Sequence, residues 1–372
     1  MQKIGFHLPL NQVSFGQLST LILRVLYERQ KEGKLDIDIS LFPIGGVDLS
    51  AQKEDKEFVA WVNGKIINGM ESWDKKTPIF KLWHLNGSLE SYSNKQTLLS
   101  FYELDRPTKV ELNIARNNNL CFTSQYSCDV FKTFGIDCKY IPPVFDSYNF
   151  SRLEKKFHID DRIVFNLCGK LEKRKHHKDV IQAWIKKYGG NSKYVLQCAI
   201  YNPFLIQQSP QGIQDLNNHF VGQIVGNNKP FNVTFYPQMK ENVVYNEFLN
   251  SANIIIGMSG GEGIGLPELQ SVAIGKHAII MNAHGYKGWA TNENSVLVNP
   301  SGKEDAADGM FFHPNQPFNQ GNIFTFDENE FLTACDLAIK RVESNPVNTE
   351  GLKLQEQFNK DKFVDNILNS LL

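Results

Sequence analysis

Residues 257–282 read GMSGGEGIGLPELQSVAIGKHAIIMN, a glycine-rich segment that continues into apolar residues. The apolar run at 252–256 predicts a buried parallel strand, and the glycine-rich segment after it predicts a turn. Pro267 falls where a helix would begin, because its missing N–H costs little there, and Gly275 falls where that helix would end. A second apolar strand over residues 278–281 completes a strand–turn–helix–strand unit.

The glycine-rich turn at the centre of this unit is suited to bind an anion. Free backbone N–H groups and the positive end of the following helix point toward one place there. One carboxylate, Glu262, lies inside the turn. A carboxylate beside an anion site makes little sense for phosphate alone, but it fits a ligand that carries both phosphate and hydroxyl groups. The turn therefore predicts a nucleotide sugar as the ligand.

Residues 259–279, SGGEGIGLPELQSVAIGKHAI, resemble the signature S-x-x-E-G-F-G-L-P-x-L-E-A-M-A-x-G-x-P-V-I of family 4 retaining glycosyltransferases. The resemblance implies the GT-B fold, an α/β architecture in which two Rossmann-like domains face each other across a cleft and the C-terminal helix crosses back to the first domain. It implies that Glu262 contacts the donor sugar. It also implies donor contacts from four residues of the turn, which are Gly263, Ile264, Gly265 and Leu266.

One position departs from the signature. The family has a second glutamate that usually holds the ribose of the nucleotide, and here Gln270 stands in its place. A glutamine amide can still hydrogen-bond a ribose hydroxyl. It lacks the charge assistance that strengthens such bonds, so the departure affects donor affinity or nucleotide choice more than the fold.

A basic segment opens the second half of the chain. An apolar strand is predicted to end at Gly169, and residues 151–187 carry 11 basic and 5 acidic side chains. The segment resembles the family motif G-R-L-x-x-x-K-G, whose cations grip the donor pyrophosphate. That resemblance assigns Lys170 and Lys175 to the two cationic positions, with Arg174 as the nearest competitor; a lysine binds phosphate as a point charge. A basic solvated turn is the alternative, and the glycine-ended strand argues against it.

The N-terminal stretch predicts a strand over residues 3–7, a turn, and an amphipathic helix with Ser14 as its N-cap. Gly16 lies in this turn, where the backbone would either come close to a ligand or only make a tight corner. His84 follows another predicted strand, over residues 80–83, and polar groups at the carboxyl end of a parallel strand point into the ligand crevice. The resembled family commonly has a histidine near here that approaches the donor sugar. A hydrogen-bonded core histidine is the alternative interpretation.

We expect three parts: an N-terminal Rossmann-like acceptor domain (1–150), a C-terminal Rossmann-like donor domain (151–345), and a C-terminal helix that packs back on the first domain (346–372). An Ile-Pro-Pro segment stiffens the chain before the boundary, which is expected between Asp146 and Asp160. Residues 302–325 are rich in Gly, Pro and Asn and indicate an irregular excursion. Residues 352–368 predict one terminal helix.

The composition is that of a soluble globular protein, with 372 residues, 41% hydrophobic and 21% charged side chains. We expect no membrane span and no signal sequence, because no apolar run is long enough. Six cysteines without C-x-x-C spacing indicate reduced, mostly buried thiols and a cytoplasmic protein, in the host cytoplasm if a bacteriophage encodes it. No cluster of metal ligands is evident, so no metal and no cofactor are expected.

These patterns predict a hexosyl- or pentosyltransferase that moves a sugar, with retention, from a UDP-linked donor to an acceptor hydroxyl. The stretches FHLPLNQVSFGQ and KLWHLNGS resemble, more loosely, glycosyltransferases of bacteriophages, which would allow a hydroxymethylated DNA base as the acceptor. The electrically neutral first domain gives DNA no electrostatic support, and a glycan, lipid-linked or protein hydroxyl is the other acceptor considered. An inactive nucleotide-sugar-binding protein and a sugar-nucleotide epimerase are the alternatives, and the oligomeric state is open.

Overall fold

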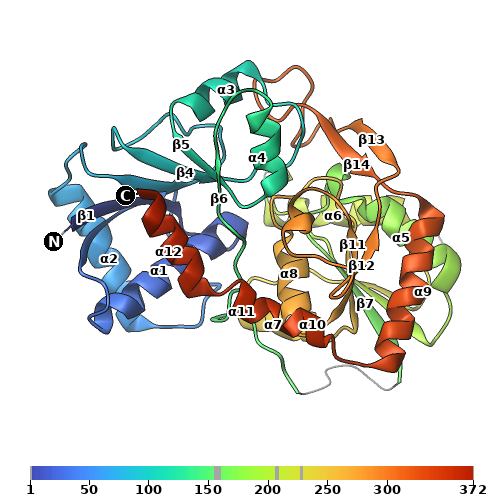
Figure 1. Ribbon diagram of the computed structural model, residues 1–372. Helices are drawn as coiled ribbons and strands as arrows, with labels where there is room; N and C mark the ends of the chain where they lie inside the picture. Colours follow the sequence, from blue (N-terminus) through green and yellow to red (C-terminus); the bar gives the residue numbers. More distant parts are fainter. Residues whose placement is uncertain (1, 155–160, 206–208, 227–228, 372) are drawn as a thin grey trace.

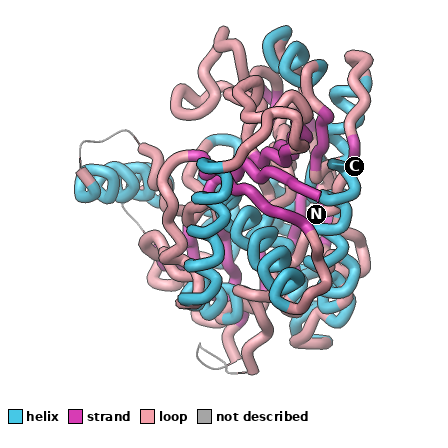
Figure 2. The backbone as a smooth tube through the Cα atoms, turned by 90° about the vertical axis from the view of Figure 1, so that its left-hand side faces the viewer, coloured by secondary structure: helices cyan, strands magenta, loops and turns pink. Residues whose placement is uncertain are grey.

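The computed structural model describes residues 2–154, 161–205, 209–226 and 229–371, and it contains two six-stranded parallel sheets side by side (Figure 1). In Figure 2 the strands lie in the interior and the helices surround them. The chain therefore has two Rossmann-like α/β units, each built on one of these sheets, as expected. The predicted boundary segment falls partly on residues 155–160, which lie outside the described residues.

The first sheet has the strand order β2-β1-β3-β4-β5-β6, and all neighbouring strands are parallel. The order reverses between β1 and β3, so a crevice is expected at the carboxyl ends of these two strands. The elements of this sheet and its helices are β1 (Gln2–Pro9), α1 (Ser14–Lys31), β2 (Ile37–Ile44), α2 (Lys56–Glu71), β3 (Ile79–Leu82), β4 (Gln96–Ser100), α3 (Lys109–Arg116), β5 (Asn119–Phe122), α4 (Gln125–Lys132) and β6 (Lys139–Tyr140).

The second sheet has the strand order β12-β11-β10-β7-β8-β9, again with parallel neighbours. Here the order reverses between β7 and β10. Its elements are β7 (Ile163–Cys168), η1 (Lys173–Lys175), α5 (His177–Tyr188), β8 (Tyr194–Ala199), α6 (Pro210–Val225), β9 (Val233–Phe235), α7 (Asn242–Asn250), β10 (Ile254–Gly257), α8 (Leu266–Ala273), β11 (His277–Met281), η2 (His284–Gly288), β12 (Val296–Val298) and α9 (Glu328–Ser344).

The sequence explains why the central strands form. All residues of β7, β10 and β11 are buried, as expected for parallel strands covered by helices on both faces. In α1 the apolar side chains recur at helical spacing and are buried against the sheet, while Val13 rather than the predicted Ser14 is the N-cap residue. In α8, Pro267 lies in the first turn, and Gly275 follows the last turn with φ +89°.

Residues 302–325 form an arm whose two ends pair as strands, while residues 306–321 between them contain no helix or strand, in keeping with the irregular excursion that the sequence indicated. The arm begins with β13 (Gly302–Asp305) and ends with β14 (Asn322–Thr325), which pair antiparallel. It reaches the first domain beside α3 (Figure 1), where Lys303 Nζ lies 2.8 Å from Asp105 Oδ2 and the Asn319 N–H donates to Glu111 at 2.9 Å. The sequence did not predict these contacts, because the partners of the arm on the first domain are distant in the sequence.

The end of the chain crosses from the second sheet to the first, as expected for a GT-B fold. The predicted single helix is three helices, namely α10 (Thr349–Leu352), α11 (Leu354–Gln357) and α12 (Lys360–Leu371). The first two pack on α8, whereas α12 packs on α1, β3 and β4. The Phe145 N–H donates to the Phe358 carbonyl at 2.8 Å where the chain crosses, and Arg29 pairs with Asp365 at 2.6 Å beyond it.

Candidate active site

A cavity of about 420 Å³ lies between the two domains, within the range of small-molecule sites. Its walls come from the carboxyl ends of strands in both sheets, including the two points where the strand order reverses. Both domains therefore contribute to one cleft. The residues that line this cleft include Phe15, His84, Phe101, Glu103, Gly169, Lys170, Glu172, Arg174, Lys175, Glu262, Gly263, Ile264, Gly265, Leu266 and Phe311.

The glycine turn between β10 and α8 lines the cleft and also packs closely against other parts of the protein. Gly265 has φ +78° and a Cβ there would overlap the ring of Tyr286, so only glycine fits as the residue that begins α8. A Cβ at Gly263 would come within 2.8 Å of Phe101 Cβ, on the first domain. The glycines thus allow the first domain to approach the turn closely, while the N-terminus of α8 opens on the cleft.

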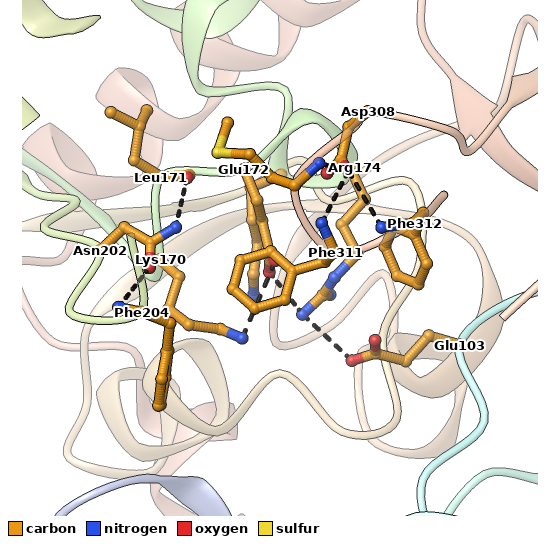
Figure 3. A network of polar contacts seen from close by, with 12 residues as sticks. Glu103, Lys170, Leu171, Glu172, Arg174, Asn202, Phe204, Asp308, Phe311 and Phe312 are labelled. Carbon is orange, nitrogen blue, oxygen red and sulfur yellow. Dashed lines mark hydrogen bonds and ion pairs between the residues drawn. The ribbon is translucent and has the colours of Figure 1, made fainter. Parts of the chain in front are cut away.

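Arg174 lies at the centre of a buried cluster of opposite charges (Figure 3). Its guanidinium is 2.8 Å from Glu172, 3.0 Å from Glu262 and 3.1 Å from Glu103. Glu103 comes from the first domain, so this contact joins the two walls of the cleft. The Arg174 guanidinium also donates to the Gly261 carbonyl, which holds it against the glycine turn. Arg174 is therefore a structural tie between three segments as well as a candidate phosphate ligand.

Lys175 pairs with Glu262 in the same cluster. Gly169 has φ +116°, and a Cβ there would lie 3.3 Å from Lys175 Cε, so this glycine leaves room for the lysine to cross the end of β7. Burial acts to raise the pKa of Glu262, but Lys175 and Arg174 outweigh it and lower the pKa to about 2. Glu262 is consequently an ionised acceptor, able to hold hydroxyl groups of a ligand.

Lys170 is the most accessible cation of the cluster, with 34% of its side chain exposed. Its ammonium lies 4.4 Å from the ring centre of Phe311, on the arm, and 5.3 Å from that of Phe204 (Figure 3). Glu172 is its nearest carboxylate, at 3.8 Å. Burial is the main reason that the pKa of Lys170 is lowered. Because Lys170 has the weakest ion pair, it is the cation best placed to meet an incoming phosphate.

His84 lies on the first-domain wall of the cleft, just beyond β3. Its ring packs on Phe15 with 4.5 Å between ring centres. Burial, helped by the charges of Lys170 and Arg174, lowers the pKa of His84 to about 4. The imidazole is therefore neutral at pH 7, with one nitrogen that can donate a hydrogen bond to a sugar hydroxyl and one that can accept a hydrogen bond from it.

Two predicted donor residues do not line the cleft. Gln270 is buried in α8, and its amide oxygen accepts a hydrogen bond from the Asp146 N–H at 3.2 Å. It therefore connects α8 to the segment between the domains, and its predicted contact with a ribose stays a prediction. Gly16 is also buried, and a Cβ there would overlap Asn11. The tight-corner interpretation of Gly16 is thus the one that this geometry supports.

Sequence reasoning missed two carboxylates of the site, Glu103 and Glu172. Glu103 follows β4, a strand of five residues that the sequence analysis did not predict. The run TLLS before it was the available signal, because side chains beyond a parallel strand face the ligand crevice. Glu172 lies inside the basic segment, at a position that the motif G-R-L-x-x-x-K-G leaves open, so the sequence assigned it no role. Among the described residues, no group of three His, Cys, Asp or Glu side chains is arranged to hold a metal ion.

Comparison with known proteins identifies the architecture. No protein-family model and no curated protein matches the sequence. Sucrose-phosphate synthase from Thermosynechococcus elongatus matches in structure with a TM-score of 0.64 at 14% identity, over 99% of this chain and 98% of that chain. A UDP-forming α,α-trehalose-phosphate synthase from Burkholderia xenovorans gives 0.63 at 12% identity, over 100% and 99%.

A third structure, Anabaena HepE in complex with UDP, matches with a TM-score of 0.58 at 13% identity, over 100% of this chain and 99% of that chain. At such low identities the likeness shows the fold alone. The chain has the GT-B fold of these glycosyltransferases, which confirms the predicted fold class. None of the described helices is long and apolar enough to cross a membrane.

Proposed function

We propose that this protein is a glycosyltransferase that moves a sugar from a nucleoside-diphosphate sugar to an acceptor hydroxyl. The observation that carries the proposal is the position of Lys170, Arg174 and Lys175 beside Glu262 and the N-terminus of α8, in a cleft between two Rossmann-like domains. Cations and backbone N–H groups suit a diphosphate, and a carboxylate suits sugar hydroxyls. Few ligand classes other than a nucleotide sugar present both.

The residues divide the chemistry between leaving group and sugar. Departure of the diphosphate leaves negative charge, which Lys170 and the free N–H groups of the glycine turn would stabilise. Glu262, held ionised by its partners, would accept hydrogen bonds from the sugar, and neutral His84 would contact it from the first domain. We further propose that transfer proceeds with retention of the anomeric configuration and that the donor carries UDP. The UDP complex of the structurally similar HepE supports the choice of nucleotide.

The acceptor would enter along the first-domain wall, where Phe15, His84 and Phe101 line the cleft. Aromatic rings beside a polar imidazole suit the face and hydroxyls of a carbohydrate. No lysine or arginine of the first domain lines the described cleft, so a glycan hydroxyl is favoured over hydroxymethylated DNA. Transfer to a hydroxymethylated duplex without transfer to any glycan would reverse this preference.

A donor screen tests the proposal. Purified protein is incubated with UDP-, GDP-, ADP- and TDP-sugars, with and without acceptor panels, and release of the nucleoside diphosphate is followed. We expect release from one donor, its loss in Glu262→Ala and Lys170→Ala, and its retention in two exposed controls, Glu247→Ala and Lys178→Ala.

The outcomes of this screen separate the alternatives. Binding of a donor without release would indicate an inactive nucleotide-sugar-binding protein. Conversion of the donor sugar without an acceptor would indicate an epimerase. Absence of binding to every donor would contradict the proposed role of the glycine turn and the cation cluster.

A further inference from the structure

The charged cluster of the cleft is already balanced before any ligand enters. Three cations, Lys170, Arg174 and Lys175, meet three carboxylates, Glu103, Glu172 and Glu262. Most of these groups are buried, so an uncompensated charge among them is costly. A diphosphate adds at least two negative charges to this balanced set. Binding such a ligand therefore requires that some negative charge of the protein is removed or moved away.

Glu103 is the carboxylate that can be neutralised at the lowest cost. It keeps 26% of its side chain exposed, whereas Glu172 and Glu262 keep 1% and 7%. It also stands on the opposite wall of the cleft from the other two. Glu262 is held by both Lys175 and Arg174, and Glu172 by both Arg174 and Lys170, but Glu103 contacts the cluster through Arg174.

We propose that Glu103 takes up one proton when a nucleoside diphosphate binds, and that this frees the Arg174 guanidinium to turn its Glu103-facing edge to the ligand. The inference rests on the proposed function, since it concerns the regulation of donor binding at the same site. The proton comes from solvent and adds to a carboxylate oxygen, so it offsets one of the negative charges that the diphosphate adds. Glu103 acts here through Arg174 and is a positioning residue.

The surroundings of Glu103 favour this proton uptake. Burial raises the pKa of Glu103, Arg174 lowers it, and the charges of Glu262 and Glu172 raise it again, to about 7. An added phosphate would raise the pKa further, because like charges disfavour ionisation. The charged or titratable groups of this region come from several packed elements. They are Lys170, Glu172, Arg174 and Lys175 near η1, Glu262 in the glycine turn, Glu268 in α8, His84 beyond β3 and Asp308 on the arm. Burial also raises the pKa of Glu268 to about 7.

The sign of the resulting pH dependence follows from linkage. If the complex binds one more proton than the free protein, the affinity for the diphosphate falls by up to about tenfold for each unit that the pH rises above the pKa of free Glu103. Below that pKa Glu103 is already protonated and the dependence disappears. The affinity for the diphosphate is therefore expected to depend on pH above about pH 7, because the pKa of Glu103 is about 7.

Titration calorimetry with UDP tests the proposal. UDP is titrated into the protein at about pH 7.5 in buffers of different ionisation enthalpy, and the slope of the heat against that enthalpy gives the protons taken up. The terminal phosphate of UDP titrates near pH 6, so the readout is the difference between variants. We expect wild type to take up about half a proton to one proton more than Glu103→Gln. Glu71→Gln, an exposed control on the first domain, should match wild type.

Each outcome decides one claim. Equal proton uptake in wild type and Glu103→Gln would overturn the inference while leaving the proposed function intact. Failure of both proteins to bind UDP would contradict the proposed function and the inference with it. If Glu103→Gln folds poorly, wild type alone still decides: a UDP affinity that does not fall between about pH 7 and 9, beyond the titration of UDP itself, contradicts proton uptake at Glu103.

Discussion

The pair of Lys175 and Glu262 offers a quantitative test of the charge balance in the cleft. Lys175→Met removes the ammonium but keeps an apolar stem of similar length. Glu262 then remains buried with Arg174 as its partner at 3.0 Å. Removing one partner of a buried ion pair costs about 3–5 kcal/mol. Because Arg174 still offsets part of the charge, we expect the free energy of unfolding to fall by the lower figure, about 3 kcal/mol.

A second substitution should reverse part of that loss. Glu262→Gln in the Lys175→Met background removes the stranded charge, and we expect about 1–2 kcal/mol of stability to return. Lys178→Met changes an exposed lysine three residues away and should stay within about 0.5 kcal/mol of wild type. Urea unfolding is followed by fluorescence, since Trp184 and Trp289 are buried in the second domain. If Lys175→Met is as stable as Lys178→Met, or if the double variant is less stable than the sum of its single changes, Lys175 does not offset the charge of Glu262 in the folded protein.

Three further predictions concern other parts of the molecule. Gly265→Ala forces a side chain to φ +78° and into the ring of Tyr286, so we expect a loss of about 1–3 kcal/mol; a thermal transition unchanged from wild type would contradict this. Asp105→Asn weakens the 2.8 Å contact with Lys303, so trypsin should cut the arm sooner than in wild type; equal cleavage rates would show that the arm does not depend on this pair. Burial lowers the pKa of His284 from 6.5 to about 4, so its contribution to stability is present above pH 6.5 and is lost as the pH falls toward 4. His284→Gln should flatten that part of the stability curve, and an unchanged slope would assign it to other groups.

Local signals predicted the second domain well. The strand, turn and helix over residues 254–273 follow from an apolar run, closely spaced glycines and a proline in the first helical turn, and each is a property of neighbouring residues. The same holds for β7 and the cations after it. These local patterns therefore predicted the elements of the second sheet that line the cleft, and the family resemblance implied the GT-B fold. The roles of these residues in binding stay predictions until a donor is tested.

The features that the sequence did not predict depend on distant contacts. Gln270 occupies the position of a ribose ligand in the signature, yet the Asp146 N–H from the segment between the domains holds its amide oxygen. Glu103 belongs to the site because the first domain approaches the glycine turn closely enough for a contact with Arg174. The partners of the arm, including Asp105 and Glu111, lie on the other domain. No local pattern records such contacts.

The most direct test of the account is a stoichiometric one. The donor selected by the screen is incubated with an accepted acceptor, and nucleoside diphosphate release and acceptor mass are measured in the same samples, for wild type, Glu262→Gln and the exposed control Glu247→Gln. We expect one sugar added to the acceptor for each diphosphate released, equal rates for wild type and Glu247→Gln, and a rate for Glu262→Gln that is lower by about a hundredfold or more. Diphosphate release without gain of acceptor mass, or an unimpaired Glu262→Gln variant, would contradict sugar transfer by this cleft.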